Sequence, residues 1–214
     1  MLDYQKNFIK YAIDCDVLRF GEFKLKSGRL SPYFFNTGLF NTGSRLARLG
    51  QFYAQTLIQS ELNVDILYGP AYKGIPLVST VSIAYAELTG HDIPFVFNRK
   101  ETKDHGEGGG LVGATLTGNA LILDDVITAG TSVRESVEII RNAGATPCGV
   151  LIALDREEKG QNQNSAIEEV RKTFGIPVLT IITLTDIIEY IENSSEFGQY
   201  LSTINEYRQI YGIR

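Results

Sequence analysis

Two adjacent carboxylates followed by a loop of small and hydroxyl residues form the most informative string in this chain of 214 residues. In ALILDDVITAGTS (residues 120–132), Asp124 and Asp125 come directly after an apolar run that predicts a buried strand. Ligands of open parallel sheets bind beyond the carboxyl ends of the strands, so both acids would face such a ligand. Adjacent carboxylates there can accept hydrogen bonds from a vicinal diol or help to hold a hydrated Mg²⁺.

The loop after the acids is suited to a phosphate monoester. Residues 128–132 (Thr-Ala-Gly-Thr-Ser) precede a helix expected at 132–142, so backbone N–H groups, hydroxyls and the helix dipole converge on one place. A diol beside a phosphate describes ribose 5-phosphate. The alternative is that the two acids only cap loops and that Ser132, in capping-box spacing with Glu135, only caps its helix.

The hydrophobic pattern predicts one α/β domain, over residues 1–214, whose central sheet is mainly parallel. Five apolar strands without polar alternation, as in a sheet covered on both faces, are expected near residues 64–68, 93–97, 121–123, 149–154 and 178–184. Helices are expected at residues 2–15, 44–59 (capped by Ser44), 75–88, 132–142, 165–174 (with Ser165 and Glu168 in capping-box spacing), and twice after Asp186. About residues 1–60 form an N-terminal extension, residues 61–214 form the core, and the polar segment 98–110 is expected to be a loop.

Composition excludes several classes of protein. The net charge of −5 argues against sequence-independent binding of nucleic acid. Two cysteines without a CxxC motif argue against a zinc site or a disulfide framework and favour a reducing compartment. We expect a cytoplasmic protein, since no apolar run is long enough to span a membrane and the N-terminus lacks a signal-peptide pattern. The glycine motifs of P-loop and Rossmann proteins are missing at the positions where they would be needed.

Four motifs in order resemble the bacterial orotate phosphoribosyltransferase family, and the resemblance covers nearly the whole chain. LILDDVITAGTS resembles the phosphoribosyl-pyrophosphate signature of type I phosphoribosyltransferases, and the other three motifs are FGEFKLKSGRLSPYFFNTG, LYGPAYKGIPL and FNRKETKDHGEGG. The resemblance implies the type I fold, a five-stranded sheet with an N-terminal hood over the base. It also implies Mg²⁺-dependent transfer of ribose 5-phosphate from 5-phosphoribosyl 1-pyrophosphate to orotate. The products would be orotidine 5′-monophosphate and pyrophosphate, in pyrimidine (UMP) biosynthesis.

The resemblance also implies roles for single residues. Asp124 and Asp125 would hold the ribose hydroxyls, Lys103 would stabilise the leaving pyrophosphate with help from His105, and Arg156 would grip the orotate carboxylate. Orotate would contact Lys26, Phe34, Phe35, Thr128 and Arg156. Phosphoribosyl pyrophosphate would contact Lys26, Tyr72, Lys73, Arg99, Lys100, Lys103, His105, Asp124, Asp125, Val126, Ile127, Thr128, Ala129, Gly130, Thr131 and Ser132. A mobile loop, residues 99–110, would reach the neighbouring subunit's site, so the active enzyme would be a homodimer.

These residue types suit the chemistry, because displacement at C1 of ribose passes through a cationic, oxocarbenium-like sugar. Cations and Mg²⁺ can stabilise the leaving group, carboxylates can stabilise the ring, and no covalent nucleophile is needed. Glycines in the loop would let it close and exclude water. The plainer alternatives are a solvated loop with balanced charges, core packing for Phe34 and Phe35, and surface positions for Lys26 and Arg156.

Three other functions remain open from the sequence. A type I transferase for a purine or uracil would have no use for Lys26 and Arg156 beside the base. A non-catalytic sensor of phosphoribosyl pyrophosphate would not need a loop that carries lysines. A Mg²⁺-dependent phosphotransfer or receiver-like domain lacks a third acid and leaves the TAGTS loop unexplained.

Overall fold

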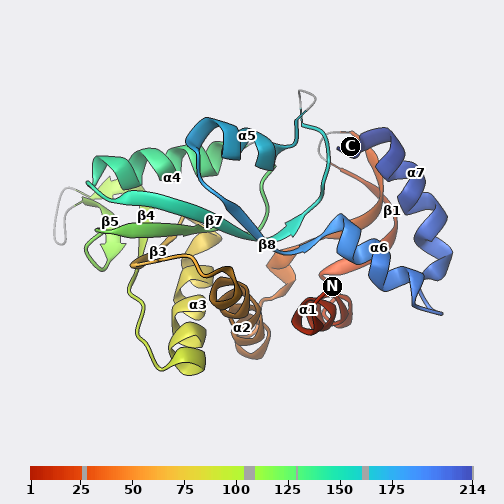
Figure 1. The fold of residues 1–214 in the computed structure, drawn as a ribbon, viewed down its shortest axis with the longest axis horizontal. Helices are drawn as coiled ribbons and strands as arrows, with labels where there is room; N and C mark the ends of the chain where they lie inside the picture. Colours follow the sequence, from red (N-terminus) through yellow and green to blue (C-terminus); the bar gives the residue numbers. More distant parts are fainter. Residues whose placement is uncertain (26–27, 104–108, 129, 161–163, 214) are drawn as a thin grey trace.

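The computed structural model describes residues 1–25, 28–103, 109–128, 130–160 and 164–213. Residues 102, 103 and 109 are described by their backbone alone. A six-stranded sheet has helices on both of its faces, and a two-stranded sheet lies at one end beside further helices (Figure 1). None of the described helices is long and apolar enough to cross a membrane.

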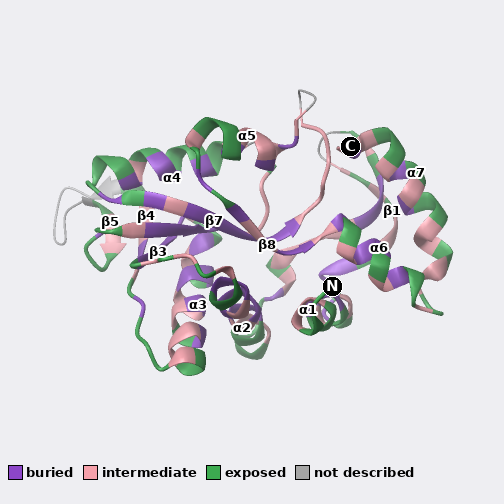
Figure 2. Cartoon of the chain, in the orientation of Figure 1, coloured by how far each residue is buried: buried purple, intermediate pink, exposed green. Residues whose placement is uncertain are grey.

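The large sheet has the strand order β5-β4-β3-β6-β7-β8. Its strands are β3 (Ile66–Gly69), β4 (Phe95–Lys103), β5 (Gly109–Gly113), β6 (Asn119–Leu123), β7 (Thr146–Asp155) and β8 (Val178–Thr183). The five predicted strands are present and parallel to their neighbours, which confirms the mainly parallel sheet. Most apolar residues of β3, β6 and β7 are buried between the helix layers, and Figure 2 shows them in purple.

The sixth strand was not predicted. Residues 98–103 continue β4 and residues 109–113 form β5, which runs antiparallel to β4 with Lys103 opposite Gly109. The expected loop over 98–110 is therefore wrong at both of its ends, and residues 104–108 lie outside the described residues. The hydrophobic pattern did not predict these strands, because the pair extends away from the core and a strand outside the core needs no regular series of apolar side chains.

Helices cover the two faces of the sheet. On one face α2 (Gly43–Ser60) packs along α3 (Gly74–Thr89), and on the other lie α4 (Thr131–Asn142) and α5 (Ala166–Phe174) (Figure 1). The capping box of α5 is confirmed: the Ser165 hydroxyl accepts from the Glu168 N–H, and the Glu168 carboxylate accepts from the Ser165 N–H. Two predicted caps are wrong. The N-cap residue of α2 is Thr42 rather than Ser44, and that of α4 is Gly130 rather than Ser132.

Both ends of the chain build the part beside β8 that we call the hood. Its elements are α1 (Asp3–Asp14), β1 (Leu18–Lys24), β2 (Leu30–Phe35), the 3₁₀ turns η1 (Thr37–Leu39) and η2 (Gly198–Tyr200), α6 (Leu184–Glu192) and α7 (Leu201–Tyr211). The strands β1 and β2 pair antiparallel, and α7 packs on β2 (Figure 1). The C-terminal helices thus join the N-terminal extension.

Candidate active site

Asp124 lies at the carboxyl end of β6 and is almost buried, with 8% of its surface exposed. Its carboxylate accepts from the Ser132 hydroxyl at 2.9 Å and from the Asp125 N–H at 2.9 Å. Its backbone carbonyl accepts from the hydroxyl of Tyr53, a fully buried residue of α2, at 2.8 Å. The end of β6 is therefore fixed from α2 on one face of the sheet and from α4 on the other.

Asp125 is held by two different segments. The Thr37 hydroxyl in η1 donates to the Asp125 carboxylate at 2.8 Å, and Lys73 forms an ion pair with the same oxygen. Val126 N–H donates to the other carboxylate oxygen at 2.9 Å. Hood, β6 and the turn between β3 and α3 meet at this one side chain.

The two acids have opposite pKa shifts. Burial, followed by the charge of Asp125, raises the pKa of Asp124 to about 6. Burial would also raise the pKa of Asp125, but the hydrogen bond and charge of Lys73 outweigh it and hold that pKa below its usual value. Asp125 is thus a permanent acceptor at neutral pH, whereas Asp124 titrates close to neutrality.

The loop from Val126 to Thr131 leads from the acids to the N-terminus of α4. Gly130 takes the left-handed conformation, with φ of 69°, and no described side chain caps the helix. The Ser132 hydroxyl donates to Asp124 instead, so the first N–H groups of α4 keep no side-chain acceptor among the described residues. An uncapped helix N-terminus beside two hydroxyl residues is a place for an anion. Ala129 lies outside the described residues.

Three of the cations predicted to bind pyrophosphate, Lys73, Arg99 and Lys100, lie on two neighbouring elements. Tyr72 and Lys73 are in the turn after β3, and the Lys100 ammonium of β4 lies 5.2 Å from the centre of the Tyr72 ring. The Ala71 N–H donates to the Asn98 side chain at 2.8 Å and joins the turn to β4. Arg99 is also in β4. Lys26 and His105 lie outside the described residues, and of Lys103 only the backbone is described.

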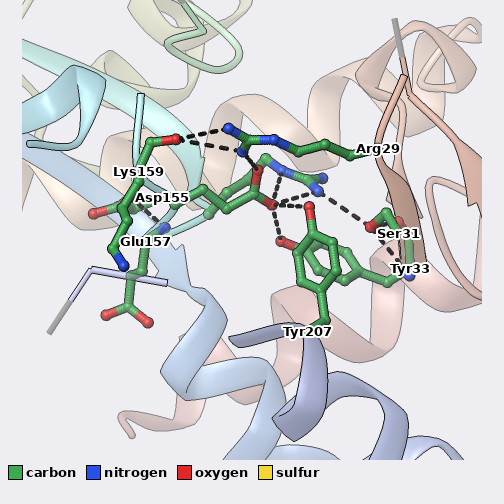
Figure 3. Close-up of polar contacts among 9 residues, drawn as sticks. Arg29, Ser31, Tyr33, Asp155, Glu157, Lys159 and Tyr207 are labelled. Carbon is green, nitrogen blue, oxygen red and sulfur yellow. Dashed lines mark hydrogen bonds and ion pairs between the residues drawn. The ribbon is translucent and has the colours of Figure 1, made fainter. Parts of the chain in front are cut away.

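Of the predicted base-binding residues, Arg156 lies where the hood meets β7, and Thr128 lies in the loop between β6 and α4. Arg156 follows β7, donates to Glu158, and lies over the ring of Tyr33, 4.3 Å from its centre (Figure 3). Burial would lower the pKa of the guanidinium, but Tyr33 and Glu158 raise it above its ordinary value, so Arg156 keeps its charge. Thr37, which contacts Asp125, comes four residues after Tyr33. At most ~14 Å of extended chain therefore separates the residue beside Arg156 from the residue beside Asp125.

Phe34 and Phe35 point to opposite faces of β2, as successive strand residues do. Phe34 stacks on Phe23, with ring centres 5.5 Å apart, whereas Phe35 contacts Phe8 edge-on at 6.4 Å in the hood core. The two rings therefore have different surroundings, and only one face of the strand carries Tyr33 towards Arg156.

Sequence reasoning missed several residues that hold the site. Thr37, Tyr53 and Tyr207 come from segments far from the motif they support, and no local pattern marks them. Glu158 had a signal: an acid two residues after an arginine expected to bind an anion needs an explanation. Tyr33 had one too, since on a strand it shares a face with Phe35, one of the two phenylalanines predicted to contact the base.

Comparisons with known proteins agree with this geometry. The phosphoribosyl transferase domain family model matches residues 40–180. The orotate phosphoribosyltransferase of Methylococcus capsulatus is 63% identical over 212 residues, which cover 99% of each chain. That of Pseudomonas syringae pv. tomato is 56% identical over 213 residues, with 100% of each chain covered.

Solved structures show the same likeness. A crystal structure of orotate phosphoribosyltransferase from Francisella tularensis has a TM-score of 0.87 at 45% identity and covers 96% of this chain and 99% of that one. The adenine phosphoribosyltransferase of Saccharomyces cerevisiae, at 16% identity and a TM-score of 0.53, shares the fold over 81% of this chain. With relatives of this identity over its full length, the chain belongs to the orotate phosphoribosyltransferase family.

Proposed function

We propose that this chain transfers ribose 5-phosphate from 5-phosphoribosyl 1-pyrophosphate to orotate, forming orotidine 5′-monophosphate and pyrophosphate in pyrimidine biosynthesis. The observation that carries the proposal is the pair Asp124–Asp125 beside the uncapped N-terminus of α4. This arrangement offers acceptors for the ribose hydroxyls and donors for the 5′-phosphate on one edge of the sheet. The curated relatives named above carry the activity in their names.

The chain's own side chains suit both ends of the breaking C1–O bond. Asp125, ionised at neutral pH, supplies negative charge for the cationic sugar, while Lys73 and Lys100 supply positive charge for the departing pyrophosphate. Ribose hydroxyls that bind to Asp125 compete with Lys73 for its oxygen, which frees the ammonium for pyrophosphate. Lys103 and His105 remain our proposed partners of the leaving group through family resemblance.

Arg156 would bind the carboxylate of orotate. Its guanidinium is planar, permanently charged and held beside the hood, which suits a planar anionic base. Uracil and the purines lack this carboxylate, so Arg156 is the residue that would separate orotate from them.

Mg²⁺ fits the site as an ion that arrives with the substrate. The described residues contain no group of three or more His, Cys, Asp or Glu side chains that could hold a metal by themselves. Mg²⁺ keeps several waters and takes one or two carboxylates together with substrate phosphates, and Asp124 and Asp125 supply such carboxylates. When bound, the ion would neutralise charge on the pyrophosphate.

We also propose a cytoplasmic homodimer in which segment 99–110 serves the neighbouring site. The family resemblance supports this assembly. So do Ile83 and Leu88, large apolar residues of α3 whose side chains are exposed in the single chain.

The loss of orotate ultraviolet absorbance tests the function. The purified protein with phosphoribosyl pyrophosphate and Mg²⁺ should consume orotate but not uracil, adenine or hypoxanthine, and chelation of Mg²⁺ should stop the reaction. The Asp125→Asn variant should lose most of the activity and is the matched control for contaminating enzyme. Consumption of another base would overturn the base assignment, and binding of phosphoribosyl pyrophosphate without any reaction would favour a sensor.

A further inference from the structure

We infer that Glu158 is a positioning residue that orients Arg156 towards the orotate carboxylate, and that Tyr207 in the last helix holds Glu158 in place. The inference rests on the proposed function and deepens it, because it extends base recognition to residues that touch no substrate. It makes α7 part of the machinery that selects the base.

One carboxylate oxygen of Glu158 gathers donors from three parts of the chain. Its Oε1 accepts from Arg156 Nε at 2.8 Å and Nη2 at 2.6 Å, from the Tyr207 hydroxyl at 3.0 Å and from the Tyr33 hydroxyl at 3.4 Å (Figure 3). The other oxygen, Oε2, lies 3.6 Å from Arg29 Nη1. The Glu158 side chain is only 14% exposed, so water screens these contacts little.

These contacts fix the guanidinium of Arg156 in both position and plane. Glu158 takes the edge that carries Nε and Nη2, the Ser31 hydroxyl accepts from Nη2 at 3.3 Å, and the Tyr33 ring supports the flat face. Among the described residues none accepts a hydrogen bond from Nη1. Nη1 therefore remains to donate to an anionic base, and the entropy of ordering this long side chain is already lost before the base arrives.

The balance of charge in this cluster favours an anionic base. Arg29 and Arg156 carry two positive charges and Glu158 carries one negative charge, which leaves one positive charge in excess. Arg29 is itself held, since it donates to the Lys159 carbonyl and lies over the Tyr211 ring at 4.9 Å. A carboxylate on the base neutralises the excess charge, whereas a neutral base leaves it.

The origin of the supporting residues points to selectivity rather than to general phosphoribosyl transfer. Arg156 and Glu158 lie within residues 40–180, the part matched by the general phosphoribosyl transferase model. Tyr33 and Tyr207 lie outside it, in β2 and α7; their rings pack edge-on, with centres 6.3 Å apart, and both hydroxyls donate to Glu158 (Figure 3). The segments added to the general domain are therefore the ones that close around the base-binding arginine.

Steady-state kinetics of Glu158→Gln test the inference. This variant keeps the shape of the side chain but removes its charge, so we expect the KM for orotate to rise by about tenfold or more. The KM for phosphoribosyl pyrophosphate and kcat should stay within about threefold. Tyr207→Phe, which removes one hydroxyl and keeps the ring, should raise the KM for orotate by about threefold, and it carries the test if Glu158→Gln does not fold.

Glu157→Gln is the matched control, because it removes the same charge from the adjacent residue. The Glu157 carboxylate accepts from Thr185 and forms an ion pair with Arg208 rather than with Arg156, so the KM of the Glu157→Gln variant for orotate should stay at the wild-type value. Glu158→Gln should also add little to Arg156→Gln, since a residue that acts through Arg156 has no route without it.

Different results would overturn the proposed function and the role of Glu158. Wild-type protein that does not use orotate would overturn the proposed function and this inference with it. An active wild type in which Glu158→Gln behaves like Glu157→Gln would overturn the inference alone. The double variant gives a second test. If its fold-change in the KM for orotate equals the product of the fold-changes of Glu158→Gln and Arg156→Gln, the two residues act independently and the inference is overturned.

Discussion

At the scale of single residues, neighbours in the sequence have different environments. Asp124 is enclosed by β6, Tyr53 and Ser132, whereas Asp125 faces Lys73 and Thr37. The sequence predicts the pair and its place at the end of a strand, because an apolar run followed by two acids permits few other arrangements. It cannot predict which of the two titrates near neutrality, since their partners come from distant segments.

The Asp124→Asn variant should be more stable than the wild type at pH 8 and inactive. A carboxyl whose pKa rises to about 6 on folding favours the folded state while protonated and loses that contribution as pH rises through 6. We expect the melting temperature to rise by a few degrees at pH 8, since ~1 kcal/mol corresponds to ~2–4 °C in a chain of this size. The gain should shrink at pH 5, where the wild-type carboxyl is already protonated.

Asp125→Asn is the contrasting variant. In the wild type, the pKa of the Asp125 carboxyl is lowered in the folded state. Asp125 therefore stabilises the fold at neutral pH and loses this contribution as pH falls. Its replacement should lower the melting temperature at pH 8. Equal shifts of the same sign in the two variants would contradict the assigned asymmetry.

At the scale of elements, the same local signal had two outcomes. Ser132 and Ser165 both stand three residues before a glutamate and at the start of a helix. Ser165 caps α5 by accepting from the Glu168 N–H, whereas Ser132 lies within the first turn of α4 and its hydroxyl donates to the buried carboxylate of Asp124. An ionised carboxylate is a strong acceptor for a hydroxyl that does not stand at the cap position. The Ser-x-x-Glu spacing does not reveal that Ser132 has a second partner, because the Asp124 carboxylate lies at the end of the preceding strand.

Alanine variants of the two serines should separate stability from ligand binding. Ser165→Ala removes a cap worth ~1 kcal/mol and should lower the melting temperature by about 2–4 °C, with an unchanged KM for phosphoribosyl pyrophosphate. Ser132→Ala should raise that KM severalfold. Thermal melts and initial rates measured on the same preparations check both, and a capping role for Ser132 would instead show as a loss of stability alone.

At the scale of the whole molecule, pattern recovers the layers but not the arrangement of the strands. Five buried strands between helices indicate a parallel sheet covered on both faces, and the structure confirms it. The position of β3 at the centre, the antiparallel β5 at the edge and the contact of α7 with β2 all depend on long-range packing. The hood is the clearest case, because residues from both ends of the chain meet only in three dimensions.

Mixed subunits test the proposed assembly. Lys103→Ala and Asp125→Asn homodimers should each lose activity by ~10²-fold or more, as is usual when one charge-stabilising group is removed. If residues 99–110 serve the neighbouring site, a heterodimer of the two variants has one intact site and should regain part of the activity. Heterodimers purified through two different tags, with each variant mixed with itself as the control, provide the measurement; no recovery would place the segment in its own subunit's site.

The contact between Tyr207 and Glu158 has a consequence for the order in which the protein becomes functional. Synthesis runs from the N-terminus, so every strand of the sheet leaves the ribosome before α7 does. The side chains that hold the acid pair, those of Thr37, Tyr53, Lys73 and Ser132, all precede Tyr207 in the chain. Under the proposed function, the residues that orient Arg156 would therefore be completed after those that bind the sugar phosphate, so base selectivity would form later than sugar-phosphate binding.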